Sequence, residues 1–382
     1  MLDSKKSIGL YIHIPFCKAK CFYCDFNSFA CMEDFIPAYF DALKKEIELY
    51  KDRLRGYTIK SIFIGGGTPS CVDHRYINEL MSQCSQNFCI EENAEISIET
   101  NPGTLTEEKL TNYNLLGINR ISMGLQAWQD RLLKKIGRIH DNHVFVENFN
   151  QARKAGFKNI NVDLIFGLPS QSKQDWVETI RNILDMQPEH LSCYSLKIED
   201  DTAFGRQLEA GELIPVEDEL DREMYYAAKE MITGSGYEHY EISNFAKPGY
   251  RCKHNLIYWK AETYIGLGAG AHSYLEGKRF NNIAPVVEYI DYLKGGSVPS
   301  GGFEIIGREE EISEYMILGL RLTDGIDIHE FRDRFNRDLF ELYGEQIKRL
   351  SGKNLLKFQE DKIMLTSKGL DLANEAFIEF LT

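Results

Sequence analysis

Residues 11–24 read YIHIPFCKAKCFYC and carry three cysteines with the spacing Cys17-x3-Cys21-x2-Cys24. The apolar, β-branched run at residues 8–14 predicts a strand, so the cysteines lie on a short loop at its carboxyl end. Thiolate is the ligand of iron–sulfur clusters, and three thiolates on one loop suit a [4Fe–4S] cluster with one iron left open. The alternatives are three incidental cysteines on a loop or, because zinc sites usually need four ligands, a zinc site completed by His13.

Strand-like and helix-like segments alternate outward from this loop. The expected strands are residues 8–14, 59–64, 95–99, 120–124, 160–166 and 191–196. The expected helices are residues 35–51, 75–88, 107–116, 143–155, 174–186 and 219–233. Such alternation indicates βαβ units and a parallel sheet. Because no Rossmann glycine fingerprint is present, an α/β partial (β/α)6 TIM-like barrel is favoured, with a flavodoxin-like sheet as the alternative.

Unusual polar and glycine residues follow five expected strands in succession. They are Cys17, residues 65–69 (GGGTP), residues 99–102 (ETNP), Gln126 and residues 167–169 (GLP). Active sites of barrel proteins gather at the carboxyl ends of the strands, so the series predicts one shared site there. For any single one of them, the alternative is that Gly and Pro merely end a strand.

The segment GGSVPSGG at residues 295–302 is typical of a linker. We therefore predict a barrel domain with an extension over residues 1–294, a linker at 295–304 and a small domain at 305–382. In that domain, expected helices (309–322, 328–335, 339–350), a hairpin (355–358 and 362–366) and a last helix from Ser367 resemble an α+β winged-helix module. Its 11 basic and 16 acidic residues favour a docking or lid role over DNA binding.

The whole chain is acidic, with 44 Lys and Arg against 58 Asp and Glu and a net charge of −14. This balance excludes a general nucleic-acid binder, because neutralising phosphates needs surplus basic residues. The sequence contains no apolar run of about 18–20 residues, and its first residues lead directly into a strand, which predicts no signal peptide. The nine cysteines are an odd number in a chain that needs no disulfide staples, so we expect a cytoplasmic, reducing location.

The cysteine spacing after a strand resembles that of the radical S-adenosylmethionine superfamily. The segment from Tyr11 to Cys17 and the glycine run at 65–69 narrow the resemblance to one branch. That branch contains the oxygen-independent coproporphyrinogen III oxidases and their HemW-type haem chaperone relatives, and the resemblance runs from Ile8 through the C-terminal module. It implies a [4Fe–4S] cluster on the three cysteines, S-adenosylmethionine bound at the open iron, and an electron donor for the cluster.

The resemblance implies that the following residues contact S-adenosylmethionine: Tyr11, Tyr23, Gly66, Gly67, Thr68, Glu99, Gln126, Arg138 and Asp163. The glycines would let the backbone approach the methionine moiety closely. Glu99 would hold the ribose hydroxyls or the ammonium group, and Arg138 would make a charge-assisted contact to the carboxylate. Gln126 and Asp163 would add hydrogen bonds, and the two tyrosines would flank the cluster and cofactor. From the residues alone, the alternatives are a buried, paired carboxylate for Asp163 and a solvated charge for Arg138.

Three features separate the two relatives within the branch. Phe26 stands two residues after Cys24, where the oxidases have a further cysteine. The cluster motif begins only 17 residues from the start, whereas the oxidases have a longer N-terminal segment. Residues 254–259 read HNLIYW and match the HNxxYW signature of the chaperones. These features favour a haem chaperone, without an assigned catalytic residue, that delivers haem to apo-haemoproteins of the respiratory kind.

Two alternatives to the chaperone stay open. The first is the oxidase reaction, in which a 5′-deoxyadenosyl radical initiates conversion of coproporphyrinogen III to protoporphyrinogen IX. The second is another radical reaction on a small substrate. Under the chaperone hypothesis, any membrane association runs through the partner proteins, and the oligomeric state is left open.

The HNxxYW motif supplies the candidate haem contacts. Neutral imidazole is a standard axial ligand of haem iron, which makes His254 the candidate ligand, with Cys252 as a second candidate. Tyr258 and Trp259 offer flat apolar surface to a porphyrin, and Asn255 would orient the imidazole or a propionate. The alternative is a histidine satisfied inside a packed strand beside core aromatics.

Overall fold

The computed structural model describes residues 6–381 of the chain. Six parallel strands form its centre, in the order of the sequence: β1 (Lys6–Ile14), β4 (Tyr57–Gly66), β5 (Ile90–Thr100), β6 (Arg120–Gln126), β7 (Ile160–Phe166) and β8 (His190–Ser195). Their apolar side chains, such as Ile12, Ile64 and Ile98, are fully buried, as in parallel sheets covered on both faces. All six expected strands are present, and the α/β radical S-adenosylmethionine fold is confirmed.

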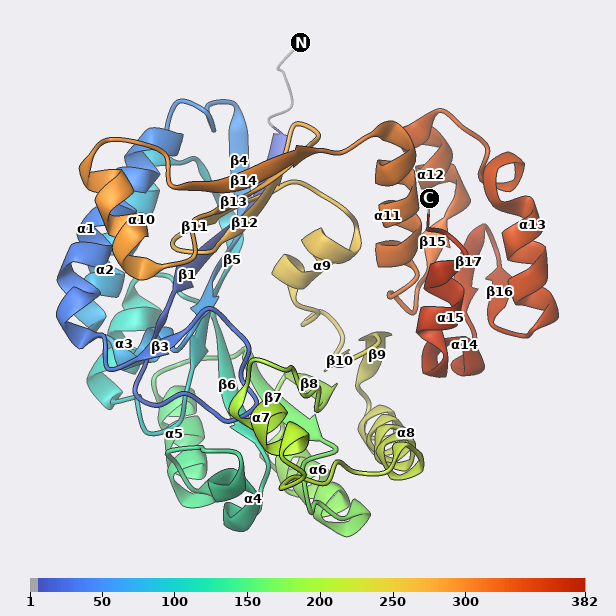
Figure 1. The fold of residues 1–382 in the computed structure, drawn as a ribbon, viewed down its shortest axis with the longest axis horizontal. Helices are drawn as coiled ribbons and strands as arrows, with labels where there is room; N and C mark the ends of the chain where they lie inside the picture. Colours follow the sequence, from blue (N-terminus) through green and yellow to red (C-terminus); the bar gives the residue numbers. More distant parts are fainter. Residues whose placement is uncertain (1–5, 382) are drawn as a thin grey trace.

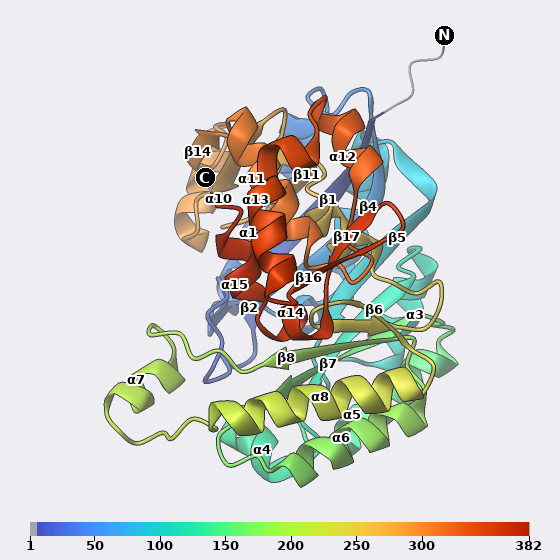
Figure 2. The ribbon, with the colours of Figure 1, turned by 90° about the vertical axis from the view of Figure 1, so that its right-hand side faces the viewer.

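Helices cover the outer face of these strands (Figures 1 and 2). The main ones are α1 (Ile36–Tyr50), α2 (His74–Asn87), α3 (Glu107–Leu115), α5 (Asn142–Lys154), α6 (Lys173–Met186) and α8 (Asp218–Gly234), with the shorter α4 (Asp130–Lys135) and α7 (Ala203–Glu209) between them. Local signals set where they begin. At α6, for example, Ser172 and Asp175 form a capping box, the kind of contact worth about 1 kcal/mol.

The sheet continues beyond the six parallel strands on both sides. On the β1 side lie β11 (Tyr264–Leu267), β12 (His272–Leu275), β13 (Lys278–Asn282) and β14 (Ser300–Ile305), with α10 (Val286–Lys294) between the last two. On the β8 side lie β10 (Asn244–Ala246) and β9 (Glu238–Glu241). A further pair joins β2 (Phe16–Cys17) and β3 (Phe29–Ala30) around the cysteine loop.

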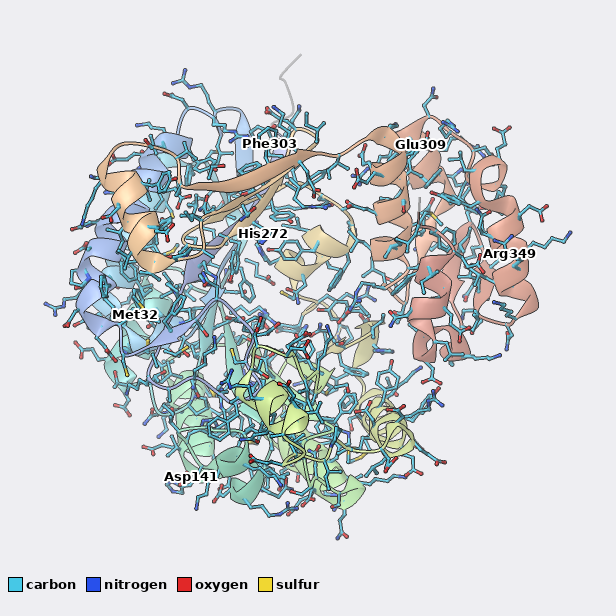
Figure 3. The ribbon with its side chains drawn as sticks, in the orientation of Figure 1. Met32, Asp141, His272, Phe303, Glu309 and Arg349 are labelled. Atoms are coloured by element: carbon cyan, nitrogen blue, oxygen red, sulfur yellow. The ribbon has the colours of Figure 1, made fainter. Side chains whose placement is uncertain are left out.

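The segment predicted as a linker, 295–304, is in part the edge strand β14. Phe303 is paired with Phe280 of β13 and lies at the edge of the sheet (Figure 3). All six residues of β14 are exposed. Because neither face of the strand is buried, its sequence does not alternate between apolar and polar residues. Its backbone pairing with β13 holds the strand in place instead.

The C-terminal domain has a hydrophobic cluster of its own around Phe331 and Phe380. Its elements are α11 (Arg308–Gly319), β15 (Ile326–Asp327), α12 (Ile328–Phe335), α13 (Leu339–Gly352), β16 (Leu356–Gln359), β17 (Lys362–Leu365), α14 (Ser367–Asp371) and α15 (Ala373–Ile378). The three strands pair in the order β15-β17-β16, so three helices and a hairpin occur where the sequence predicted them. The last expected helix is divided into two at Leu372.

A short helix, α9 (Lys253–Trp259), lies between the barrel and the C-terminal domain (Figure 1). It carries the HNLIYW motif on a helix, and the strand assumed for the satisfied histidine is not formed there. The neighbouring strand β9 also touches the C-terminal domain, through a bridge between Glu241 and Leu322.

The chain ends bear on two sequence predictions. The prediction of no signal peptide rests on residues 1–5, which lie outside the described residues, as does Thr382 at the end of the predicted C-terminal domain. Within residues 6–381, no helix is both long enough and apolar enough to cross a membrane.

Candidate functional site

A cavity of about 350 Å³ opens at the carboxyl ends of the parallel strands. Its lining includes eleven of the residues singled out in the sequence: Cys17, Cys21, Tyr23, Cys24, Gly66, Gly67, Thr68, Glu99, Gln126, Arg138 and Asp163. They come from the cysteine loop, from the ends of β4, β5, β6 and β7, and from the segment after α4. Residues more than a hundred positions apart therefore face one space, at the edge where the strand-end pattern placed a site.

The cysteine loop presents three partly exposed free thiols to this cavity. The Cys17 Sγ lies 3.5 Å from Thr68 Oγ1, and the Cys24 Sγ lies 3.7 Å from Ser28 Oγ. Lys20 holds the loop in shape, because its Nζ donates to the carbonyl oxygens of Phe26 at 3.0 Å and of Ser28 at 3.1 Å. Burial raises the pKa of both Cys17 and Cys24, so these thiols release a proton when a metal binds them.

The glycine run at the end of β4 packs tightly against the cysteine loop. Gly66 has φ +114°, a left-handed conformation that favours glycine, and a Cβ there would lie 2.6 Å from the His13 ring. A Cβ on Gly67 would lie 2.7 Å from the Phe16 carbonyl oxygen and 3.0 Å from the Cys17 Sγ. Bare backbone is therefore required where the run passes the cysteines, which keeps the space for a ligand open.

Glu99 ends strand β5 and accepts a hydrogen bond from the Gly66 backbone N–H at 3.0 Å. Burial, and then the nearby charge of Asp163, raises the pKa of Glu99 to about 8. A cationic ligand in the cavity would favour the ionised form of this carboxyl. The Glu99 carboxyl is thus suited to bind a cationic group of a ligand, such as an ammonium, or to lie beside a sulfonium.

A backbone irregularity aims Gln126 into the cavity. Gln126 has φ +75°, and the pairing of β6 with β7 shifts register between Gly124 and Gln126. Irregularities of this kind often redirect a side chain at a functional site, and a non-glycine residue at positive φ costs free energy that the fold must offset. The strained position is consistent with a binding role for the Gln126 amide.

Asp163 on β7 is oriented by two donors. Its oxygens accept hydrogen bonds from Ser122 Oγ and from Asn161 Nδ2, each at 2.8 Å. This pairing matches the alternative of a paired carboxylate, yet Asp163 also lines the cavity. The two interpretations are compatible, because the donors fix the carboxylate while one side of it faces the open space.

Arg138 also faces the cavity, and it is not a solvated charge. One guanidinium nitrogen donates to Asn101 Oδ1 at 2.7 Å and to the Gly124 carbonyl oxygen, and another lies 3.5 Å from the Cys21 Sγ. The Arg138 Nε is buried without a partner. A buried donor without an acceptor is costly, so this guanidinium retains capacity for an anionic group of a ligand.

The donor set fits an iron–sulfur cluster better than the zinc alternative. Both ring nitrogens of His13 are engaged, Nδ1 with the Tyr11 hydroxyl at 3.0 Å and Nε2 with the Asn27 carbonyl at 2.8 Å. Among residues 6–381, no three His, Cys, Asp or Glu side chains are arranged to hold a single ion. A cluster places each thiolate on a different iron, so three cysteines suffice for it without a fourth protein ligand.

Tyr11 is the one predicted S-adenosylmethionine contact that is not part of the cavity lining. Its ring stacks on Phe63 with 6.3 Å between centroids, inside the barrel. The cavity also contains residues that the sequence analysis passed over, among them Ser122, Tyr194, Ser195, Leu196, Lys197 and Glu199. Most of them lie at the end of the sixth expected strand or just after it, so applying the strand-end rule to this strand as well would have found them.

The imidazole of His254 is enclosed within the protein. The residue is 1% exposed, its Nδ1 lies 2.9 Å from Ser61 Oγ, and its Nε2 lies 2.9 Å from the Tyr258 hydroxyl. Burial, followed by the charges of Arg120 and Lys60, lowers the pKa of His254 to about 3, so the ring is neutral. A neutral imidazole is the form that binds iron, but in this conformation both of its nitrogens have protein partners.

The other residues of the motif lie on the same short helix at the domain boundary. Trp259 stacks beneath Arg321 of the C-terminal domain, with 4.3 Å from the guanidinium carbon to the ring centroid. Asn255 is partly exposed. Cys252, the second candidate ligand, is fully buried and lies 3.5 Å from Glu95 Oε1. None of the four haem candidates His254, Asn255, Tyr258 and Trp259 lines the strand-end cavity.

Comparisons with known proteins agree with this architecture. Residues 11–183 match the Radical SAM superfamily, and residues 306–372 match the HemN C-terminal domain. Among solved structures, the coproporphyrinogen III oxidase HemN from Escherichia coli aligns with a TM-score of 0.87, covering 98% of this chain and 90% of that chain. The two sequences are 23% identical, so this likeness establishes the fold alone.

Among curated proteins, the heme chaperone HemW of Bacillus subtilis is 39% identical over 97% of this chain and 98% of its own length. The heme chaperone HemW of Lactococcus lactis is 37% identical over 99% of this chain and 98% of its own length. Superfamily membership implies a [4Fe–4S] cluster and S-adenosylmethionine, and the cavity offers the thiols and the glycine run that these groups need. The chain belongs to the HemW family of the radical S-adenosylmethionine superfamily.

Proposed function

We propose that this protein is a cytoplasmic haem chaperone built on a radical S-adenosylmethionine scaffold. In this proposal it holds a [4Fe–4S] cluster on Cys17, Cys21 and Cys24, binds S-adenosylmethionine in the strand-end cavity, and hands haem to apo-haemoproteins of the respiratory kind. Two relatives that match this chain over 98% of their own length are named heme chaperone HemW. An electron donor would reduce the cluster.

The observation that carries the proposal over the oxidase alternative is the state of Phe26. This side chain stands at the cavity rim, where the oxidases have a further cysteine, and it is 63% exposed. A phenyl ring has no thiol, so whatever the further cysteine supplies in the oxidases is not available at this position of the cavity rim.

Within the cavity, the described side chains divide the work of binding. The cysteine loop would hold the cluster, and the glycine run would admit the methionine moiety. Glu99 would take the ammonium or the ribose hydroxyls, and Arg138 the carboxylate, since its Nε is buried without a partner. The bound cluster would supply an open iron to which S-adenosylmethionine could bind.

A haem titration of the cluster-reconstituted protein under anaerobic conditions tests the proposal. We expect a saturable Soret band in the wild type and a weaker or shifted band in His254→Ala. His272→Ala is the matched control, because His272 lies on β12, outside the HNLIYW motif, and is exposed where His254 is enclosed. An unchanged band in His254→Ala would remove His254 as the axial ligand.

The oxidase alternative is tested in the same preparation. The protein is incubated with coproporphyrinogen III, S-adenosylmethionine and a reductant, and the porphyrin products are quantified. We expect no accumulation of protoporphyrinogen IX beyond one equivalent. Accumulation over many turnovers would overturn the chaperone assignment.

A further inference from the structure

Helix α9, which carries His254, is too short to be stable alone. It spans seven residues, whereas isolated helices shorter than about 12–15 residues are marginal in water. Its order therefore depends on contacts with its surroundings, and these contacts come from two different domains. The balance between them decides whether His254 stays enclosed.

The barrel holds the N-terminal end of α9. The carboxylate of Glu95 accepts hydrogen bonds from the backbone N–H groups of Lys253 and His254, each at 3.1 Å. The His254 ring, in the first turn of the helix, stacks on Phe63 with 5.2 Å between centroids and meets Ser61. These contacts fix one end and one face of the helix.

The C-terminal domain holds the other end of α9. One guanidinium group, that of Arg334 on α12, donates to the carbonyl oxygens of Lys260 at 2.9 Å and of Ala261 at 2.6 Å. These two residues directly follow the helix, where carbonyl groups lack intrahelical partners. Ala261 is at φ +48°, a strained conformation for alanine that these hydrogen bonds help to hold.

A second arginine of the C-terminal domain covers the same end. Arg321 stacks on Trp259 at 4.3 Å and lies 3.7 Å from the buried carboxylate of Glu241 on β9. Ala261 also packs against the hydrophobic cluster of the C-terminal domain. Figure 1 shows α9 lying between the two bodies, so the small domain closes over the helix from outside.

We infer that the C-terminal domain is a latch that holds α9 closed, and that release of α9 from Arg334 and Arg321 exposes His254 to the haem iron. The inference rests on the proposed function for the haem step, but not for the latch itself. Release of α9 explains how the His254 ring, with both nitrogens hydrogen-bonded, becomes available to a ligand. The strand-end cavity can stay folded during this release, because no residue of α9 lines it. From the sequence we expected a docking or lid role for the acidic C-terminal module, and in this inference the module docks onto α9.

Hydrogen exchange followed by mass spectrometry tests the latch in the full-length, cluster-reconstituted protein. In Arg334→Lys the charge and aliphatic stem remain, but an ammonium cannot reproduce the fork that reaches both carbonyl groups. We expect exchange at residues 253–261 to be about tenfold faster, the change that loss of a hydrogen bond to a charged group produces. Arg332→Lys is the matched control, since Arg332 lies on the same helix and pairs with Asp338 at the surface.

Stopped-flow haem binding gives the second readout. We expect Arg334→Lys to bind haem faster than the wild type, and the double variant with His254→Ala to lose this gain. Wild-type exchange rates at residues 253–261 in Arg334→Lys would overturn the latch, as would faster exchange with an unchanged haem association rate. A wild type that binds no haem would overturn the proposed function, while the exchange comparison would still decide whether Arg334 holds α9.

Discussion

In the strand-end cavity the polar groups face an open space, whereas the ring of His254 on α9 faces protein on every side. The cavity presents three partly exposed thiols and an unpartnered Arg138 Nε. His254 is 1% exposed and has a partner for each nitrogen. The first region is preorganised for its ligands, and the second must rearrange before it can bind one. Cofactor binding and haem binding should therefore respond differently to mutation and to pH.

The largest effect is expected from the cluster ligands. Cys21→Ala removes one of three thiolates and should abolish the iron–sulfur absorbance and the bound iron. Cys31→Ala is the matched control, because Cys31 is an exposed free thiol close to the loop. Iron analysis and visible spectra of the reconstituted variants measure both. Full iron content in Cys21→Ala would show that the ligand set is wrong.

A methyl group on the glycine run should have the next largest effect. In Gly67→Ala the added Cβ would lie 2.7 Å from the Phe16 carbonyl oxygen, so backbone must move. Overpacking of this kind costs about 1–3 kcal/mol, and we expect affinity for S-adenosylhomocysteine to fall about tenfold or more. Calorimetry measures the affinity. Gly344→Ala on α13 has open space around the new Cβ and should bind like the wild type.

The pH dependence of cofactor binding should follow Glu99. Its pKa is raised to about 8, so at neutral pH the free protein carries mostly the neutral carboxyl, and an ammonium ligand prefers the carboxylate. Affinity for S-adenosylhomocysteine should therefore rise about tenfold between about pH 6.5 and about pH 7.5. Glu99→Gln should give a flat profile. Parallel profiles in the two proteins would contradict the contact.

The α9 region should respond to pH in the opposite sense. The pKa of His254 is lowered to about 3 in the closed helix, so the opened helix takes up a proton below the ordinary histidine value of about 6.5. The closed state of α9 therefore loses stability as the pH falls below about 6.5. The equilibrium constant for opening should rise about tenfold for each pH unit below that value. Exchange at residues 253–261, corrected for the intrinsic rate, measures the opening. His254→Gln should lack this dependence, and equal slopes would refute the assignment to His254.

The strand-end cavity could largely be predicted from the sequence, whereas the enclosure of His254 could not. Strong apolar runs and a polar residue at each strand end located the six parallel strands and the cavity, because parallel strands share one edge. The strand β14 was missed, since its exposed residues show no alternation. Tyr11, which was expected beside the cofactor, stacks on Phe63, and its contact with the cofactor stays a prediction.

The HNLIYW motif shows a different limit of sequence analysis. The sequence identifies the residue types around His254, but burial depends on partners far along the chain. Ser61 meets one ring nitrogen from strand β4, and Arg334 holds the end of the helix from another domain. Such long-range contacts leave no local pattern, so the closed state of α9 is visible only in the folded molecule.

Transfer of haem tests the central claim most directly. The haem-loaded, reconstituted protein is mixed anaerobically with an apo-haemoprotein of the respiratory kind, the two are separated, and the Soret band of each is measured. The account predicts that haem moves to the recipient, and that His254→Ala transfers less than His272→Ala. Haem that stays with the donor, or that reaches the recipient no faster than free haem does, would contradict it.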